Sequence, residues 1–170
     1  MQLGLDISTT TTGYAITTND SIIELGFVDL KKQTDISDKA WTLVNHLCEL
    51  DSLESVKDII VEDSLSGFMR GRTSQQTIIK LAKFNAVVCF LCEYQLQIKP
   101  VLVGAMTARK QLFGKSRIKG MTAKEFVKNR VEEKYDVEDF MKYTTRGNWD
   151  NRNMDALDAL VVSKYMLPHK

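Results

Sequence analysis

The chain has 170 residues, of which 44% are hydrophobic and 26% are charged, and its formal net charge is +1. This size and composition fit a single domain over residues 1–170, with enough apolar side chains for a core that needs no disulfide or metal cross-link. Two prolines, nine glycines and no repeated motif exclude a collagen-like or low-complexity chain. No apolar run reaches the roughly 18 residues of a membrane span, and no signal peptide is recognisable. We therefore expect a cytoplasmic or nucleoid-associated protein, and a viral or organellar origin is compatible with this.

The near-zero net charge hides an uneven distribution along the chain. Residues 64–130 contain thirteen Lys and Arg side chains and two acidic ones, whereas the rest contains ten basic and twenty acidic residues. Such a basic segment can bind a polyanion, although acidic residues elsewhere could instead neutralise it through surface ion pairs. Because basic residues gather in two Gly- and Ser-containing loops, 68–72 and 114–120, we favour contacts to a phosphate backbone. The candidate DNA-binding residues of this segment are Arg70, Arg72, Lys80, Lys83, Lys115, Arg117 and Lys119.

The first third of the chain predicts mainly strands. Three short apolar runs, 3–7, 13–18 and 22–30, are separated by turn residues and indicate an antiparallel meander. A helix is then expected, capped by Ser37 or Asp38, with Trp41 on its core side.

The rest of the chain alternates between strands and helices. Residues 58–63 are apolar up to terminal carboxylates, which is typical of a buried parallel strand. A long helix over 73–94 and a strand over 98–103 follow. Three helices complete the chain: 107–113, 122–134 with a hydroxyl cap at its start, and a last one from 151–153 to 166. The order βββ-α-β-α-β-α-α-α predicts an α/β domain with a mixed sheet of five strands flanked by helices.

Four acidic residues stand out by their positions. Asp6 lies in the first strand, Glu62 ends the fourth, and Asp155 and Asp158 are three residues apart on the last helix. An i, i+3 pair projects from nearly one side of a helix, about 4.5 Å apart along the axis. Taken singly, each acid has a simpler interpretation as a turn or surface residue. Together, carboxylates beside an apolar surface are costly unless a cation neutralises them, and oxygen ligands suit Mg²⁺ or Mn²⁺.

The cysteines offer a second candidate metal or redox site. Cys89 and Cys92 form a CxxC pair, but they lie in an apolar helical stretch and no second ligand pair follows. We therefore favour buried apolar residues over ligands.

Three segments together resemble a known family. They are LGLDISTTTTGYA at 3–15, IIVED at 59–63 and NMDALDAL at 153–160, and their order and spacing match along nearly the full chain. The sequence resembles the RuvC-type Holliday junction resolvases of the ribonuclease H-like superfamily. The closing NMDALDAL helix, following a strand that ends in Glu, is the most specific part of this resemblance.

The resemblance implies a fold, an activity and a site. The fold is a ribonuclease H-like mixed five-stranded sheet, and the protein is a homodimer that resolves four-way and other branched DNA junctions by paired symmetrical nicks. Asp6, Glu62, Asp155 and Asp158 match the four catalytic, metal-binding carboxylates. Two Mg²⁺ ions per site, for which Mn²⁺ can substitute, would activate water and neutralise phosphate charge. Phe68 stands near the place of the family's aromatic wedge against the junction. Independently of the resemblance, we expect Lys119 or Arg117 of the basic loop to stabilise developing phosphate charge.

Departures from the family pattern leave some questions open. The Arg70-Gly71-Arg72 segment is more basic, and the region 110–124 is longer, than the shortest family pattern. The cleavage sequence preference and the need for a branch-migration partner are therefore not predicted. A ribonuclease acting on RNA–DNA hybrids and a non-catalytic junction-binding protein remain as alternatives. A sugar-kinase-type ATPase is disfavoured because it needs two such domains and a glycine where Ser8 stands.

Overall fold

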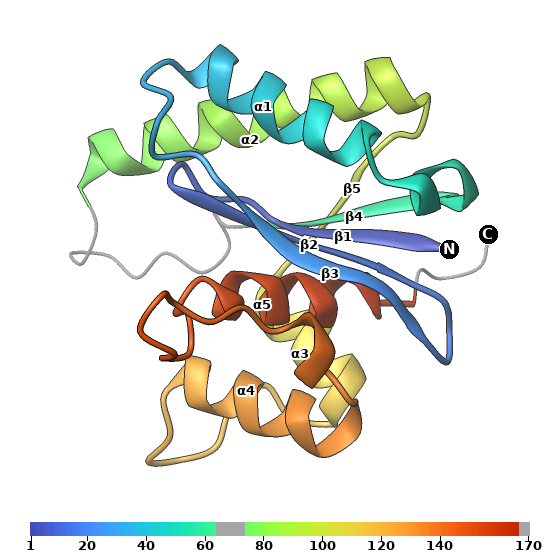
Figure 1. The fold of residues 1–170 in the computed structure, drawn as a ribbon, viewed down its shortest axis with the longest axis vertical. Coiled ribbons are helices and arrows are strands. Elements are labelled where there is room, and N and C mark those ends of the chain that lie inside the picture. The colour runs from blue at the N-terminus through green and yellow to red at the C-terminus, as the bar shows by residue number, and fades with distance from the viewer. Residues whose placement is uncertain (64–73, 167–170) are drawn as a thin grey trace.

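The computed structural model describes residues 1–63 and 74–166 (Figure 1). The strands and helices confirm the predicted order of elements. They are β1 (Gln2–Asp6), β2 (Thr11–Thr17), β3 (Ile22–Asp29), α1 (Ile36–Cys48), the short 3₁₀ helix η1 (Asp51–Ser55), β4 (Asp58–Glu62), α2 (Gln75–Leu96), β5 (Val101–Val103), α3 (Ala105–Phe113), α4 (Ala123–Lys134), the short 3₁₀ helix η2 (Glu138–Phe140) and α5 (Asn153–Ser163).

The strands form one mixed sheet in the order β3-β2-β1-β4-β5. The first three strands pair antiparallel, as the meander predicts, whereas β4 is parallel to β1 and β5 is parallel to β4. Leu5 of β1 pairs with Val61 of β4. Because parallel strands end at the same edge, Asp6 and Glu62, one residue further along each strand, lie next to each other there.

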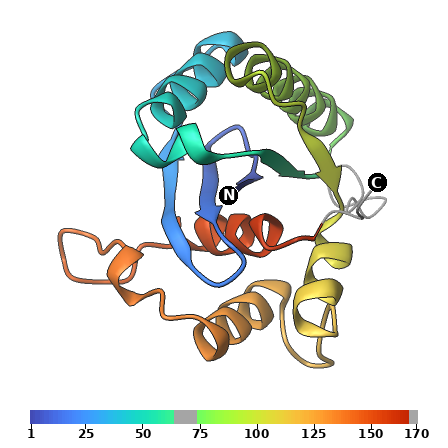
Figure 2. The same cartoon turned by 90° about the vertical axis from the view of Figure 1, so that its right-hand side faces the viewer.

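Helices cover both faces of the sheet, with α1 and α2 on one side and α3, α4 and α5 on the other (Figures 1 and 2). Side chains alternate between the two faces along a strand. Leu3 and Leu5 pack into the core beneath α1 and α2, whereas Ile60 belongs to the core shared with α5. The alternation therefore directs Asp6 and Glu62 towards the α5 side.

Helix α5 lies unusually close to the sheet because two glycines face it. A Cβ atom on Gly4 would lie 2.3 Å from the carbonyl oxygen of Ala159, and one on Gly13 would lie 1.8 Å from that of Asp155. No side chain fits at either position without moving the helix. These two glycines fix how closely α5 approaches β1 and β2.

Helix α1 differs from its prediction in two respects. Its cap is Asp35, whose side chain accepts a hydrogen bond from the Ser37 amide, rather than Ser37 or Asp38. Trp41 is 41% exposed, because the buried stripe runs through Ala40, Leu43, Val44 and Leu47. Trp41 has helical spacing to Val44, but it lies one position outside that stripe.

Other boundaries shift by a few residues. Strand β5 begins at Val101, after Pro100, and α5 ends at Ser163, earlier than predicted. The start of α4 agrees with the sequence: Thr122 and Glu125 form a reciprocal capping box.

Helix α2 presents an apolar stripe to solvent. Ile79, Phe90 and Tyr94 are all more than half exposed, and the rings of Phe90 and Tyr94 stack with centroids 6.2 Å apart. On its inner face Cys92 is fully buried, and burial raises the pKa of Cys89 to about 11, which favours the structural interpretation of this pair. Within residues 1–63 and 74–166, no helix combines the length and apolar character needed to cross a membrane.

Candidate active site

Two neighbouring strands and one helix bring the four predicted carboxylates to one edge of the sheet. Asp6 ends β1 and Glu62 ends β4, side by side on the α5 face. Gly13 of β2 pairs directly with Asp6 and lies against the backbone of Asp155. The first turns of α5 are therefore placed over the end of β1.

The electrostatic influence of the other three acids on Asp6 indicates that the four side chains lie near one another. The pKa of Asp6 is raised well above its usual value, first by burial and then by repulsion from Glu62, Asp158 and Asp155. Burial followed by repulsion from Asp158 raises the pKa of Glu62 to about 7. Each of the other three acids thus acts on Asp6.

The pKa values of the two acids of α5 are also raised. Burial is the main reason that the pKa of Asp155 rises to about 6, and Lys124 partly opposes this rise. The pKa of Asp158 is raised by burial, although the neighbouring Arg109 guanidinium lowers it. Like charges held together in a poorly solvated site raise the free energy of the folded protein unless positive charge neutralises them.

Arg109 supplies part of that charge and was not anticipated from the sequence. This residue lies on α3, and its Nη2 donates to Oδ1 of Asp158 at 2.9 Å. The two side chains are only 13% and 14% exposed, so the ion pair lies in the interior of the site. The available signal was topological: α3 starts two residues after β5, the strand that pairs with the Glu62 end of β4.

The chemistry of the four acids fits a divalent cation. All the donor atoms are carboxylate oxygens, which Mg²⁺ and Mn²⁺ prefer, and their mutual repulsion is what a bound cation relieves. Among the described residues, however, no three His, Cys, Asp or Glu side chains are arranged closely enough to hold a metal ion. Asp158 is instead directed to Arg109.

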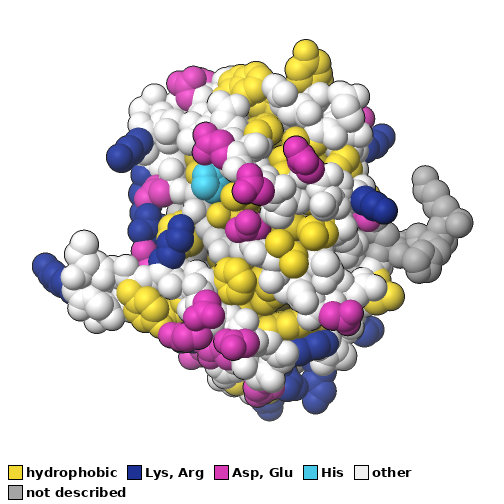
Figure 3. Space-filling model, turned by 45° about the vertical axis from the view of Figure 1, so that its right-hand side comes forward, with side chains coloured by type: hydrophobic (Ala, Val, Ile, Leu, Met, Phe, Trp, Pro, Cys, Tyr) yellow, Lys and Arg dark blue, Asp and Glu magenta, His cyan; other side chains and the backbone are white. Residues whose placement is uncertain are grey.

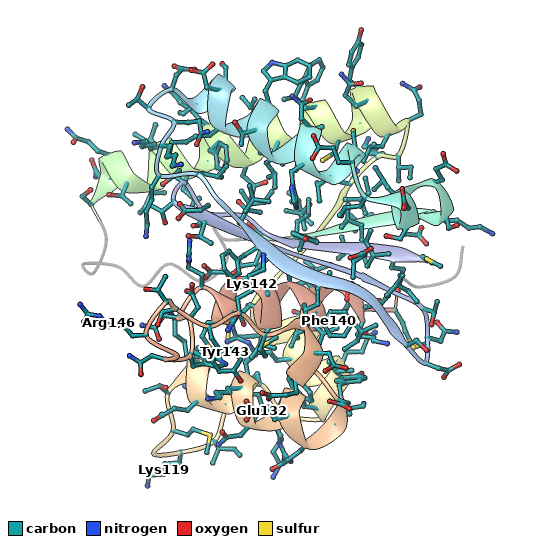
Figure 4. The ribbon with its side chains drawn as sticks, viewed as in Figure 1. Lys119, Glu132, Phe140, Lys142, Tyr143 and Arg146 are labelled. Carbon is teal, nitrogen blue, oxygen red and sulfur yellow. The ribbon has the colours of Figure 1, made fainter. Side chains whose placement is uncertain are left out.

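Basic residues flank the carboxylates from two other elements. Lys124, in the first turn of α4, acts electrostatically on both Asp155 and Asp158, and Lys31, just after β3, acts on Asp155. Neither lysine was selected from the sequence. Lys119, which was selected, lies at the far end of the α3–α4 loop, away from the sheet (Figure 4). Lys115 and Arg117 of the same loop are exposed.

A polar hollow adjoins the end of β1. Its volume is about 490 Å³, and it lies between the turn that follows Asp6 and the start of α2. Its walls are formed by Ser8, Thr9, Thr10, Ser74, Gln76, Thr77, Lys80 and Leu81. Lys80 therefore contributes to a hollow beside the turn that follows Asp6, whereas Lys83 is exposed further along α2.

The hydroxyl-rich turn beside this hollow is held rigidly. Ser8 Oγ donates to the Thr11 carbonyl at 2.6 Å and accepts from the Thr11 amide at 3.2 Å. The buried Lys39 side chain donates to the carbonyl oxygens of Thr9 and Leu30, at 2.7 and 2.5 Å. Lys39 could not be selected from the sequence, since its contacts depend on the tertiary fold.

Three predicted DNA-binding residues, Phe68, Arg70 and Arg72, lie outside the described residues. The structure therefore does not test those predictions.

Comparison with known proteins supports the fold through structure rather than sequence. No protein-family profile and no curated protein sequence match the chain. Thermus thermophilus RuvC in complex with Holliday junction substrate is 12% identical, with a TM-score of 0.60, over 95% of this chain and 90% of that one. A second Thermus thermophilus RuvC structure is 15% identical, with a TM-score of 0.61, over 95% of this chain and 91% of that one. The chain has the RuvC fold.

The yeast mitochondrial Holliday junction resolvase Ydc2 has the same fold. It is 14% identical, with a TM-score of 0.59, over 96% of this chain and 75% of that one. The predicted ribonuclease H-like sheet and the resemblance to RuvC-type resolvases are thus confirmed at the level of fold. In this RuvC fold, the three sequence segments that resemble the family meet at the carboxylate edge of the sheet.

Proposed function

We propose that this protein is a metal-dependent endonuclease that resolves four-way DNA junctions by paired nicks. The observation that supports this most strongly is the convergence of four acids, Asp6, Glu62, Asp155 and Asp158, at one edge of a RuvC fold. Structural neighbours with this fold include a RuvC bound to a Holliday junction and a mitochondrial Holliday junction resolvase.

The four carboxylates are the ligands that we assign to two Mg²⁺ ions. When bound, Mg²⁺ lowers the pKa of water and neutralises charge on phosphate oxygens, as phosphodiester hydrolysis requires. Asp6 and Glu62 are held on adjacent strands, so their positions depend on the sheet. Asp155 and Asp158 are held on α5, whose position depends on Gly4 and Gly13.

Basic and hydroxyl groups around the carboxylates would position the DNA strand. Lys124 adds positive charge beside Asp155 and Asp158, where negative charge develops on a phosphate during hydrolysis. The hollow lined by Ser8, Thr10 and Lys80 offers hydroxyl and ammonium donors to the neighbouring backbone phosphates. We assign the cut strand to a path across this edge of the sheet.

Paired nicks require two sites, which a symmetrical dimer provides. The surface best suited to dimerisation is the apolar stripe of α2, formed by Ile79, Phe90 and Tyr94. Next to it, β5 is an edge strand, and Leu102 on it is 55% exposed. An apolar helix face beside a strand edge with unpaired backbone groups is typical of a subunit interface.

The nuclease activity can be tested with two variants of one strand. Glu62→Gln removes a charge from the cluster, whereas Asp58→Asn makes the matching change at the opposite end of β4. End-labelled four-way junction, linear duplex and RNA–DNA hybrid of one sequence are incubated with each protein in Mg²⁺, Mn²⁺ or EDTA. We expect wild type and Asp58→Asn to cut the junction with either metal, and Glu62→Gln to be inactive.

The same experiment distinguishes the alternatives. Preferential cutting of the hybrid would replace the resolvase with a ribonuclease. Tight junction binding without cutting in either metal would leave a non-catalytic junction-binding protein.

A further inference from the structure

Residues 142–149, between η2 and α5, form a small hairpin that the proposed function has not used. Tyr143 and Trp149 form an isolated antiparallel bridge. The turn is closed by the Thr144 amide, which donates to the Asn148 carbonyl at 2.7 Å, and by Gly147, whose φ of +76° places it in the left-handed region. The hairpin projects from the body of the molecule in two perpendicular views (Figures 1 and 2).

The base of this hairpin is fixed to the start of α5. The Asn153 side chain accepts from the Lys142 amide at 3.0 Å and donates to the Lys142 carbonyl at 2.8 Å. The Asp150 amide donates to the same carbonyl at 3.0 Å. Asn153 is buried, and Asp155 is two residues further along the helix. The hairpin and the catalytic acids of α5 are therefore parts of one rigid unit.

Ring contacts fix the base further. The Lys142 ammonium lies 4.7 Å from the centroid of the Phe27 ring on β3. Trp149 packs against the core, with the Lys128 ammonium 4.6 Å from its ring centroid. The Tyr143 hydroxyl donates to a Glu138 carboxylate oxygen. Such an anchored loop can hold a ligand with little further loss of conformational entropy.

The tip, in contrast, is free and basic. Residues 144–148 are all exposed, and residues 140–149 contain two basic side chains and no acidic one. Within the described part of the chain, the Arg146 side chain has no ion pair or hydrogen bond. It points outward, away from the sheet (Figure 4). The tip therefore presents a guanidinium, two hydroxyls and an amide to a partner.

The location and surrounding charge restrict that partner. The hairpin lies at the same end of the molecule as the start of α5 and the start of α2, where the carboxylate edge is (Figure 1). Figure 3 shows Lys and Arg side chains at the end of the projecting arm and on the body beside it. Acidic residues gather on the other side of its base, in a hollow where Glu132, Glu133, Asp136 and Glu138 outnumber a single base, Lys134. A polyanion is attracted to one side of the hairpin and repelled from the other.

We propose that the 142–149 hairpin binds the sugar–phosphate backbone of a DNA duplex arm, with Arg146 as its main contact. This inference rests on the proposed function and adds a contact outside the carboxylate site. Guanidinium, hydroxyl and backbone amide groups are the usual donors to phosphate oxygens, and contacts of this kind position DNA without reading its sequence. Because the hairpin is joined rigidly to α5, a bound arm is held in register with Asp155 and Asp158.

The test measures DNA affinity rather than cleavage. Fluorescence anisotropy is recorded in EDTA, with a four-way junction and a linear duplex, over a series of salt concentrations. We expect Arg146→Ala to weaken binding of both DNAs about three- to tenfold and to reduce the slope of log affinity against log salt by about 1. Arg146→Lys should retain most of the slope.

Two further variants test whether DNA binding depends on the position of the positive charge in the hairpin or only on the total charge of the protein. Lys57→Ala removes one positive charge from an exposed residue just before β4, at the opposite end of the sheet, and should bind like wild type. Gly147→Val keeps the charge but strains a backbone with φ of +76°, and no atom lies within 4 Å of the position of its new Cβ. Binding of both DNAs by this variant should fall, while any drop in its melting temperature should be limited to several degrees, because the strain is confined to an exposed turn.

The outcomes distinguish this inference from the proposed function. Suppose that the wild-type protein cuts junctions and that Arg146→Ala binds both DNAs as tightly as wild type does. The proposed hairpin contact is then wrong, and the proposed nuclease activity is unaffected. A loss confined to the junction, with duplex binding intact, would also overturn it. If the wild-type protein binds neither DNA, both proposals fail.

Discussion

At the scale of single residues, the site holds acidic side chains close enough for their charges to repel one another. Asp6, Glu62 and Asp158 are partly buried acids whose charges repel one another, and each has a raised pKa. Arg109 forms an ion pair with Asp158, and among the described residues neither Asp6 nor Glu62 has an ion pair of its own. An arrangement that is unfavourable for the protein alone is favourable for binding a divalent cation.

The first prediction concerns stability without metal. The pKa of Glu62 is about 7 in the folded protein and 4.5 in its ordinary environment. Between these values the folded state keeps a proton that the unfolded state has lost, so the contribution of Glu62 to stability falls as pH rises. The loss above pH 7 is at most on the order of 3 kcal/mol. Glu62→Gln should therefore be more stable than wild type in EDTA at about pH 8, and its advantage should shrink at about pH 5.

Thermal unfolding by circular dichroism measures this difference. Comparing variant with wild type removes the opposite contribution of His46, whose pKa burial lowers. Mg²⁺ should raise the melting temperature of wild type and of the Asp58→Asn control, but not of Glu62→Gln. A Glu62→Gln variant less stable than wild type at about pH 8 would contradict the account.

A second prediction compares two lysines. Lys124 acts on Asp155 and Asp158, whereas Lys119 lies away from the sheet (Figure 4). Lys124→Ala should lower the rate of cleavage at saturating DNA on the order of tenfold to a hundredfold, because positive charge beside the reacting phosphate is lost. Lys119→Ala, with the same change in charge, should affect mainly affinity. Equal effects of both changes on the saturated rate would show that Lys124 has no special position.

At the scale of secondary-structure elements, the site depends on how closely α5 packs on β1 and β2. Gly4 and Gly13 lie directly beneath the helix backbone. This contact transmits the position of the sheet to Asp155 and Asp158, and it explains why small residues interrupt otherwise apolar strands at these two positions.

The third prediction follows from this packing. A Cβ at Gly13 would lie 1.8 Å from the Asp155 carbonyl oxygen, so Gly13→Ala must displace α5. We expect a loss of stability of at least about 2 kcal/mol and loss of cleavage. In the control Gly26→Ala, on β3, the new Cβ would meet the end of the Tyr14 side chain, which can move more easily than backbone. Chemical denaturation and junction cleavage are measured on both variants. Near-wild-type activity of Gly13→Ala would show that the position of α5 is not critical.

Local patterns explain which elements could be predicted from the sequence. The Thr122–Glu125 capping box and the apolar run of β4 are short-range signals, and both appear in the structure as expected. Trp41 was misplaced because helical spacing alone does not decide which of two adjacent stripes is buried. Contacts between distant elements had no local signal, and Arg109 pairs with a residue 49 positions away.

The residues of the site likewise divide into those that local sequence patterns could predict and those that depend on the tertiary fold. The four carboxylates could be selected because three of them end or begin recognisable elements and the pair on α5 has helical spacing. Lys31, Lys39 and Lys124 could not be selected, because their roles depend on which loops and helix ends the tertiary fold brings together. Residues 142–149 form a hairpin whose anchoring by Asn153 has no signature in sequence.

At the scale of the whole molecule, the apolar stripe of α2 and the β5 edge form the surface assigned to dimerisation. Phe90→Asp places a charge at a residue that is 65% exposed, so it should convert a dimer to a monomer while leaving the fold intact. Ile23→Asp, on the opposite edge strand β3, makes a similar change at a residue that is 36% exposed. Sedimentation velocity at micromolar concentration measures both. A wild-type protein that is monomeric when fully active would contradict the assignment.

Mapping the nicks in a four-way junction labelled separately on each strand tests the proposed resolvase activity. With Mg²⁺ we expect cuts at symmetrical positions in two opposing strands, absent in EDTA and absent for Asp6→Asn, although Asp6→Asn still binds the junction. Cuts that persist undiminished in Asp6→Asn, or a junction that is bound but never cut in either Mg²⁺ or Mn²⁺, would contradict the proposal.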